Sequence, residues 1–204
     1  GTQSQNVYAV AMGATVLWST AFGSSQNDAV TSMTCAPGLL FVAGITSGTM
    51  PNQLGPSITN TEGNQQLFVL AVDTSSGTTL WTRQLAVNCQ GPVWVSADRT
   101  TRKLSLATSS AAGLANSFAA TDWQYIQLDF EGQVELGFSL GSTSADQVHS
   151  VAMSDNMVVI AGVHDNSPQI WVRCGSDICS AGDCVWNTPN PRQCSSANQA
   201  AGKG

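Results

Sequence analysis

The sequence predicts an all-β protein that consists of repeated four-stranded antiparallel sheets and ends in a cysteine-rich tail. Short runs of β-branched and aromatic residues alternate with turn residues such as Ser-Ser-Gly along most of the 204-residue chain, a pattern typical of strands joined by tight turns. Groups of these runs recur three times, which is typical of a repeat protein. Outside the Ala-rich region 111–120, no stretch keeps a helical period for three turns.

The first copy of the repeat is predicted at residues 5–48. Strands are expected at 7–12, 16–20 and 39–46, and a turn of the form Gly-Ser-x-x-x-Asp at 23–28 precedes the third of its four strands. The strand at 39–46 is nearly continuous in apolar residues. Such a run is typical of a strand that is buried on both faces.

The second copy is predicted at residues 65–110 and the third at 122–165, followed by a single strand at 168–173. The expected strands are 67–73, 80–83, 93–95 and 104–108 in the second copy, and 125–129, 136–139, 148–153 and 158–163 in the third. Loops at 48–64 and 111–120 absorb the differences in length between the copies, as surface connections do at little entropic cost.

A four-stranded sheet has two faces to bury, so the copies are expected to stack face to face. This is the arrangement of blades in a β-propeller or of coils in a β-solenoid, and the doubly apolar strand at 39–46 favours blades. A small propeller needs at least about four blades to close a ring, whereas the sequence holds about three blades and one strand. We therefore expect bare apolar sheet faces at the two ends of the repeats.

Several segments resemble the β-propeller repeat of secreted and cell-surface proteins, which is often arranged as seven blades. The similarity lies in the Gly-Ser-x-x-x-Asp turns at 23–28 and 141–146, in the apolar run at 41–46, and in Ser-Gly-Thr-Thr-Leu-Trp at 76–81. The second copy departs from this pattern, because Asn-Cys-Gln-Gly stands at 88–91. The resemblance implies a scaffold or adhesive surface module with no catalytic residues to carry over.

A second resemblance concerns the tryptophans. The segment from Ala71 to Trp81, Ala-x-Asp-x-x-Ser-Gly-x-x-x-Trp, is similar to the tryptophan-docking motif of quinoprotein dehydrogenase propellers, in which the tryptophan packs between adjacent blades. Because four tryptophans recur at strand positions, we predict that they pack between blades and do not form a platform for sugar stacking. These residues are Trp18, Trp81, Trp94 and Trp171.

Together these features predict a non-enzymatic, extracellular structural or interaction module. Bare blade faces favour contacts between copies of the chain, as a homo-oligomer or as the polymer of a surface fibre or layer. The strand at 168–173 is suited to complete the sheet of a neighbour, through Gln169, Ile170, Trp171 and Val172. Two alternatives stay open: a fragment of a larger propeller adhesin or lectin-like protein that binds glycans, and a fragment of a quinoprotein-like oxidoreductase.

Charge and apolar run length exclude two kinds of partner. Only seven Lys and Arg are present and the net charge is −6, which does not provide a basic surface for nucleic acid. The longest apolar runs, at 39–45 and 157–163, are far shorter than the roughly 20 residues of a membrane-spanning helix. The chain opens with Gly1 and without a basic and apolar leader, which predicts a processed mature chain or a fragment of a longer protein.

Six cysteines predict disulfide bonds and an extracellular or cell-surface location. Four of them lie in the predicted tail, residues 174–204, which has little apolar surface to bury and follows the repeat domain at 1–173. Disulfides are favoured over a metal site because no histidine lies near these four, and their spacing is loosely similar to the first part of a growth-factor-like module. Cys35 and Cys89 are candidates for a bridge between adjacent blades. The predicted disulfide cysteines are Cys35, Cys89, Cys174, Cys179, Cys184 and Cys194.

The sequence predicts no catalytic, metal or cofactor site. A hairpin turn at 155–156 would bring Asp146 near His164, and we interpret this as an ordinary structural pair because no nucleophile and no third group accompany it. Asp28 and Asp146 share a repeat position, and both are expected to accept hydrogen bonds from backbone N–H groups of a turn. Thr188, which is followed by Pro-Asn-Pro, is a candidate for O-glycosylation.

Overall fold

The computed structural model describes residues 7–13, 15–55, 58, 60, 64–112, 121–141, 144–154, 157–174 and 184–187. The regular secondary structure of these residues is strand throughout, which confirms the predicted all-β class. The strands are β1 (Val7–Met12), β2 (Val16–Phe22), β3 (Asp28–Ala36), β4 (Leu39–Thr46), β5 (Gln66–Asp73), β6 (Thr79–Cys89), β7 (Trp94–Asp98), β8 (Lys103–Ala112), β9 (Asp122–Asp129), β10 (Val134–Leu140), β11 (Gln147–Ser154), β12 (Met157–His164), β13 (Ser167–Cys174) and β14 (Cys184–Asn187). No helix among the described residues meets the length and hydropathy needed to cross a membrane.

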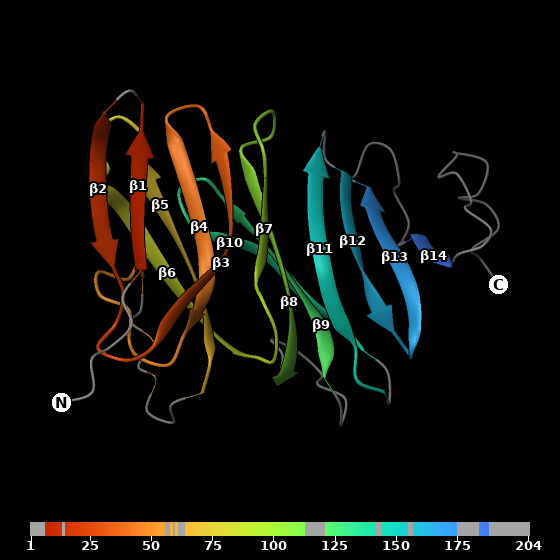
Figure 1. Ribbon diagram of the computed structural model, residues 1–204. Coiled ribbons are helices and arrows are strands. Elements are labelled where there is room, and N and C mark those ends of the chain that lie inside the picture. The colour runs from red at the N-terminus through yellow and green to blue at the C-terminus, as the bar shows by residue number, and fades with distance from the viewer. Residues whose placement is uncertain are drawn as a thin grey trace.

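Successive strands pair antiparallel and form layers that follow one another across the molecule (Figure 1). We name β1–β2 the N-terminal hairpin, and we name the meanders β3–β6, β7–β10 and β11–β14 the first, second and third layers. The first and second layers belong to one hydrogen-bonded sheet, because the end of β6 meets the end of β8 at Asn88↔Ala112 and Cys89↔Ser110. Figure 1 shows the N-terminal hairpin at one end of the molecule and the third layer at the other.

Neighbouring layers enclose hydrophobic cores. On β4, Phe41 and Ala43 belong to the core shared with the second layer, whereas Val42 belongs to the core under the N-terminal hairpin. Since successive residues of a strand alternate between faces, both faces of β4 are covered, as its continuous apolar run predicts. The core between the first and second layers includes Phe41, Leu67, Val69, Leu104, Leu106, Ile126 and Leu128. The core between the second and third layers includes Trp123, Tyr125, Val148, Val151, Val158, Ile160 and Trp171. The core under the hairpin includes Val42, Met50, Phe68, Leu70 and Val72.

The layers and the copies of the sequence repeat are out of phase by two strands. The sequence assigns β1 to β4 to one sheet, but β4 pairs with β5 of the next copy, from Leu39↔Asp73 to Thr46↔Gln66. β8 pairs with β9, and β12 with β13, in the same way. A repeated pattern looks the same wherever its unit is taken to begin, and only strand pairing fixes where a sheet ends. Each layer therefore takes its first two strands from one copy and its last two from the next.

Strand β13 has a neighbour on each side, which corrects the prediction of a single terminal strand. Trp171 pairs with Ile160 of β12 and with Val185 of β14. The same double pairing holds for the residues predicted to complete a neighbour's sheet, Gln169, Ile170, Trp171 and Val172. A strand with both edges paired offers no free N–H and C=O groups to a partner, so the assembly role of this strand is contradicted. The sequence missed β14 because its residues lie in the region assigned to a disulfide-rich tail.

Candidate functional site

Two tryptophans join neighbouring layers through the same kind of contact. Trp18 on β2 donates from Nε1 to a turn carbonyl of the first layer at 2.8 Å, and its ring lies against Gly77 of that turn. Trp81 on β6 donates to a turn carbonyl of the second layer at 2.9 Å, and its ring lies against Gly132. Both side chains thus pack between sheets, as the sequence predicted.

The two turns need glycine for these contacts. Gly77 and Gly132 have φ angles of 74° and 86°, in the left-handed region that favours glycine. A Cβ atom would lie 2.7 Å from the ring of Trp18 at the first position and 3.0 Å from the ring of Trp81 at the second. The backbone is therefore the surface on which each indole rests. Each of these tryptophans therefore packs directly on a turn of the next layer.

The other two predicted tryptophans lie between the second and third layers. Trp94 on β7 donates from Nε1 to the carbonyl of Val148 on β11 at 3.3 Å. Trp171 is buried, with ring centroids 6.1 Å from Tyr125 and 5.2 Å from Phe138. Both positions agree with a packing role.

Asp146 and His164 meet as predicted. The carboxylate of Asp146 is fully buried, and its Oδ2 lies 2.9 Å from Nδ1 of His164 while its Oδ1 accepts a hydrogen bond from the backbone N–H of Asp165 at 2.8 Å. Asp28, at the matching position of the first layer, accepts from the N–H and the hydroxyl of Ser24 at 2.6 and 2.9 Å. Asp28 thus holds the loop before β3 and Asp146 holds the turn between β12 and β13. Because both carboxylates bind backbone N–H groups at the same repeat position, the structural interpretation of the Asp146 pair is the better one.

Cys35 and Cys89 are free thiols, which contradicts a bridge between them. They lie on β3 and β6, with β4 and β5 between, so three strand spacings of about 4.8 Å separate them, well beyond the roughly 7 Å that a disulfide spans between Cα atoms. Burial raises the pKa of the Cys89 thiol to about 12, so this side chain is a neutral core group.

The other predicted covalent sites lie in or near the C-terminal part of the chain, residues 174–204. Cys179, Cys194 and Thr188 fall outside the described residues. Cys174 and Cys184 lie on β13 and β14, of which only the backbone pairing is described at these positions. Among the described residues, no group of three or more His, Cys, Asp or Glu side chains is arranged to hold a metal ion.

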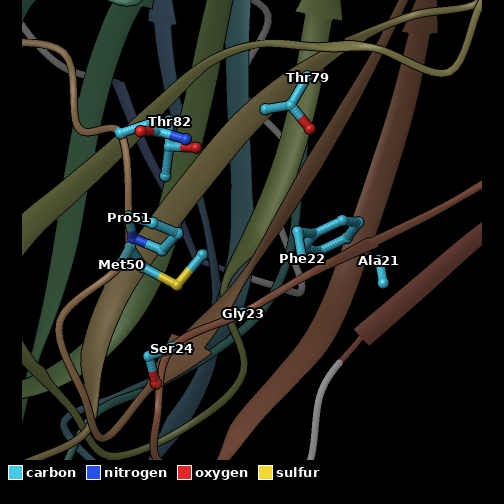
Figure 2. Close-up of a pocket in the computed structure, with 9 residues that line it drawn as sticks. Ala21, Phe22, Gly23, Ser24, Met50, Pro51, Thr79 and Thr82 are labelled. Atoms are coloured by element: carbon cyan, nitrogen blue, oxygen red, sulfur yellow. The ribbon is translucent and has the colours of Figure 1, made fainter.

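Two of the hollows that the described residues line lie at strand ends. One, of about 270 Å³, opens between the N-terminal hairpin and the first layer, and Figure 2 shows Ala21 and Phe22 on one side of it and Met50 and Pro51 on the other. The second, of about 480 Å³, is lined by the loop that follows β6 and by the start of β11. Its lining includes Trp94, Gln90, Gln147 and His149.

Five large apolar side chains of the N-terminal hairpin are exposed. We name four of them the N-terminal apolar surface: Tyr8, Val10, Met12 and Val16; the fifth is Leu17 on β2. Tyr8 and Met12 are 70% and 75% exposed, although their neighbours on the other face of the hairpin, Trp18 and Phe22, pack on the first layer. Sequence reasoning did not single out these residues, but large side chains at 8, 10 and 12 alternate with alanine at 9 and 11, which is a signal of two unequal faces.

The opposite end of the stack also presents apolar side chains. Val158 and Ile160 of β12 point into the core with the second layer, so the alternate residues of this strand point outward. Met157 on β12 and Ile170 on β13 are exposed on that outer face. The molecule therefore carries two different apolar faces, one at each end.

Comparison with known proteins adds no family. The sequence matches no protein-family model and no curated protein. The remaining guide to function is the arrangement of the layers and of the sheet faces at the two ends. The candidate functional site is the N-terminal apolar surface.

Proposed function

We propose that this chain is a non-enzymatic, propeller-like structural module of an extracellular fibre or surface layer, and that its copies contact one another through the sheet faces at the two ends. The observation that carries the proposal is the N-terminal apolar surface. Inside the molecule every comparable sheet face lies against another layer. This face lacks such a neighbour among the described residues, and β1 and β2 carry no charged residue that would oppose burial.

The size of the surface sets the strength of the contact. Full burial of a Val or Met side chain stabilises a complex by about 1.5–3 kcal/mol, whereas association costs an estimated 4–15 kcal/mol in lost freedom of motion. Four side chains with their partners on the other face support a weak pairwise contact. A weak contact is adequate where many copies are held in a row, because each copy is bound at both ends.

The two end faces differ, so the contact is heterologous. The N-terminal apolar surface of one copy would face the outer side of β12 and β13 of the next, where Met157 and Ile170 are exposed. A head-to-tail contact of this kind generates a ring if the rotation closes and a filament if it does not. A stack of layers that continues from copy to copy favours the filament.

Sedimentation velocity over a range of protein concentrations tests the proposal. The wild-type chain should form larger species as its concentration rises, and the double variant Tyr8→Lys, Met12→Lys should stay monomeric because two ammonium groups cannot be buried unpaired. The matched control is Leu80→Lys, since Leu80 is an exposed apolar residue on β6 of the first layer and belongs to neither end face. A wild-type chain that remains a monomer at millimolar concentration contradicts the proposal, and so does a double variant that assembles like the control.

The larger hollow favours a second candidate, a glycan-binding module. Trp94 offers an aromatic ring beside the side chains of Gln90, Gln147 and His149, a combination suited to the apolar faces and hydroxyl groups of a sugar. Titration of tryptophan fluorescence with neutral oligosaccharides tests it. Saturable quenching that is lost in His149→Ala supports binding in this hollow, and an unchanged signal rejects it.

A further inference from the structure

The smaller of the two hollows, between the N-terminal hairpin and the first layer, is uncharged and has two apolar walls. None of the nine described residues that line it carries a charge. Figure 2 shows the ring of Phe22 on one side of the space and the side chains of Met50 and Pro51 on the other. Its volume of about 270 Å³ lies just under the roughly 300–1,000 Å³ of pockets that bind drug-sized ligands. The hollow therefore has room for a small neutral molecule of one ring.

Thr82 on β6 lines this hollow with a hydroxyl that has no partner within the described part of the chain. The residue is only 4% exposed, and no described residue makes a hydrogen bond with its side chain. Its backbone carbonyl, by contrast, accepts a hydrogen bond from the N–H of Leu54 at 2.7 Å. Because a buried polar group without a partner is costly, nearly all such groups in native proteins are bonded. The hydroxyl of Thr82 therefore marks a place where a ligand gains a hydrogen bond.

Two further polar side chains border the same space. Thr79 on β6 and Asn52 in the loop after β4 line the hollow, and neither side chain makes a hydrogen bond to a described residue. Ser24 differs, because its hydroxyl donates to Asp28 at 2.9 Å and accepts from the N–H of Gln26 at 3.0 Å. Two hydroxyls and one amide thus have donors and acceptors to offer beside the two apolar walls.

Buried hydrogen bonds fix the loop that forms one of these walls. Gln84 on β6 is 1% exposed, and its side-chain carbonyl accepts a hydrogen bond from the N–H of Met50 at 2.8 Å. Its amide donates to the carbonyl of Gly48 at 3.0 Å. The side-chain amide of Gln53 donates to the carbonyl of Met50 at 3.0 Å. A wall that is already rigid loses little freedom when a ligand binds, so more of the contact energy appears as affinity.

We propose that this hollow binds one ring of a neutral, hydroxylated ligand of the hexopyranose class. The C–H face of the ring packs against Phe22, and its hydroxyl groups exchange hydrogen bonds with Thr82, Thr79 and Asn52. Hydroxyl and amide groups both donate and accept, which suits a ligand that carries several neighbouring hydroxyl groups. The site lies on the inner side of the hairpin, so it depends neither on the self-association of the end faces nor on the larger hollow.

Other classes of ligand fit this chemistry less well. A charged ligand would bury its charge among uncharged residues, which is unfavourable without an opposite charge. A purely apolar ring would leave the hydroxyl of Thr82 buried and unpaired. A phenol has one hydroxyl group and would use only part of the set formed by Thr79, Thr82 and Asn52.

The methyl group of Met50 provides a probe inside the hollow. Met50 lines it and is 2% exposed, whereas Met12 and Met33 belong to other surfaces. The full chain, isotopically labelled at its methionine methyl groups, is titrated by NMR with the methyl glycosides of glucose, galactose and mannose. At least one should shift the Met50 signal saturably, with a dissociation constant on the order of millimolar, and leave Met12 and Met33 unchanged. Tetrahydropyran, the same ring without hydroxyl groups, and glucuronate, which is charged, should each bind at least about tenfold more weakly.

Two variants remove hydrogen-bonding groups and keep the backbone. Thr82→Val replaces the hydroxyl by a methyl group of similar shape, and Asn52→Gly removes the amide at a residue whose φ of 52° lies in the region that glycine favours. Each should weaken the best sugar at least about fivefold. Asn52 is exposed, so its variant tests the contact without a change in the core. Thr34→Val, the same change on β3 and outside both hollows, is the matched control and should bind like the wild type.

Three results overturn the proposal: a Met50 signal that none of the glycosides shifts, equal binding of tetrahydropyran, and unchanged binding to Thr82→Val and Asn52→Gly. Sugar binding that leaves Met50 unshifted and is lost in His149→Ala also overturns it, because such binding belongs to the larger hollow. None of these results bears on the end faces, which the sedimentation of the Tyr8→Lys, Met12→Lys variant tests separately.

Discussion

Strands β1 and β5 are similar in sequence and opposite in environment. β5 reads Gln-Leu-Phe-Val-Leu-Ala-Val-Asp, and the six residues from Leu67 to Val72 are fully buried between two layers. β1 reads Val-Tyr-Ala-Val-Ala-Met and exposes the side chains of Tyr8, Val10 and Met12. An apolar run therefore predicts a strand, whereas the number of layers around it decides how many of its faces are buried. The difference locates the end of the molecule at which we propose that copies make contact.

The largest expected effect is the loss of a core side chain from β5. Leu70→Ala should lower the free energy of unfolding by about 2–5 kcal/mol, because it leaves a cavity under the N-terminal hairpin. Val10→Ala on β1 should change it by no more than about 0.5 kcal/mol in the monomer. Urea denaturation of both variants measures the contrast. Equal costs would mean that the exposed face of β1 is buried in solution.

A smaller effect is expected at the turns that receive tryptophan. Gly132→Ala should lower the free energy of unfolding by roughly 1–3 kcal/mol, because the residue has a positive φ and its new Cβ would meet the ring of Trp81. Gly13→Ala is the matched change in the turn of the N-terminal hairpin, where a Cβ has space and φ is not positive. It should be close to neutral in thermal denaturation. A neutral Gly132→Ala would show that the indole does not rest on this turn.

The thiols of Cys35 and Cys89 differ in burial as β1 and β5 do, so their reactivity tests the same contrast without a mutation. Burial raises the pKa of Cys89 to about 12, so at pH 8 its thiol is protonated and should react with iodoacetamide only after unfolding. Cys35 is exposed on β3 and should be alkylated at once. The folded pKa of Cys89 is raised, so the stability linked to it is present below about pH 9 and decreases as the pH rises toward 12. Mass spectrometry of native and denatured samples tests this, and rapid labelling of Cys89 in the native chain would contradict its burial.

The smallest effect concerns the exposed turn beneath Trp18. Hydrogen bonds from the side chain and backbone of Ser75 and from Ser76 hold the pKa of Asp73 below its usual value. Because the folded pKa is lowered, this stabilisation is present above the ordinary pKa of Asp and disappears as the pH falls through the folded value. Ser75→Ala should raise the pKa of Asp73 in an NMR titration. Ser19→Ala, an exposed serine on β2, is the control and should leave that pKa unchanged.

The sequence predicted the features that depend on nearby residues. The positions of most strands, the burial of β4 on both faces, the contact of Asp146 with His164 and the turn role of Asp28 all follow from local pattern or from one hairpin. The sequence also predicted that Trp18 and Trp81 pack between sheets, because a tryptophan that recurs at the same strand position is expected to bury its ring against a neighbouring sheet.

Features that depend on distant pairing were not predicted. The sequence does not say whether β4 belongs with β1 or with β5, since a repeat has no marked beginning. It placed β13 at an edge because the four residues of β14 are too short a run to be recognised among turn residues. It allowed a bridge between Cys35 and Cys89 because the separation of β3 from β6 is visible only once the order of strands is known.

Oxidation of the methionines by dilute hydrogen peroxide, followed by mass spectrometry, tests most directly the claim that β3 and the N-terminal hairpin each have a sheet face without a covering strand. Met12 and Met33 lie at these open positions, whereas Met50 is 2% exposed in the core under the hairpin. In dilute monomer, Met12 and Met33 should oxidise at least about tenfold faster than Met50. A Met33 that oxidises as slowly as Met50 in the free monomer would contradict the account.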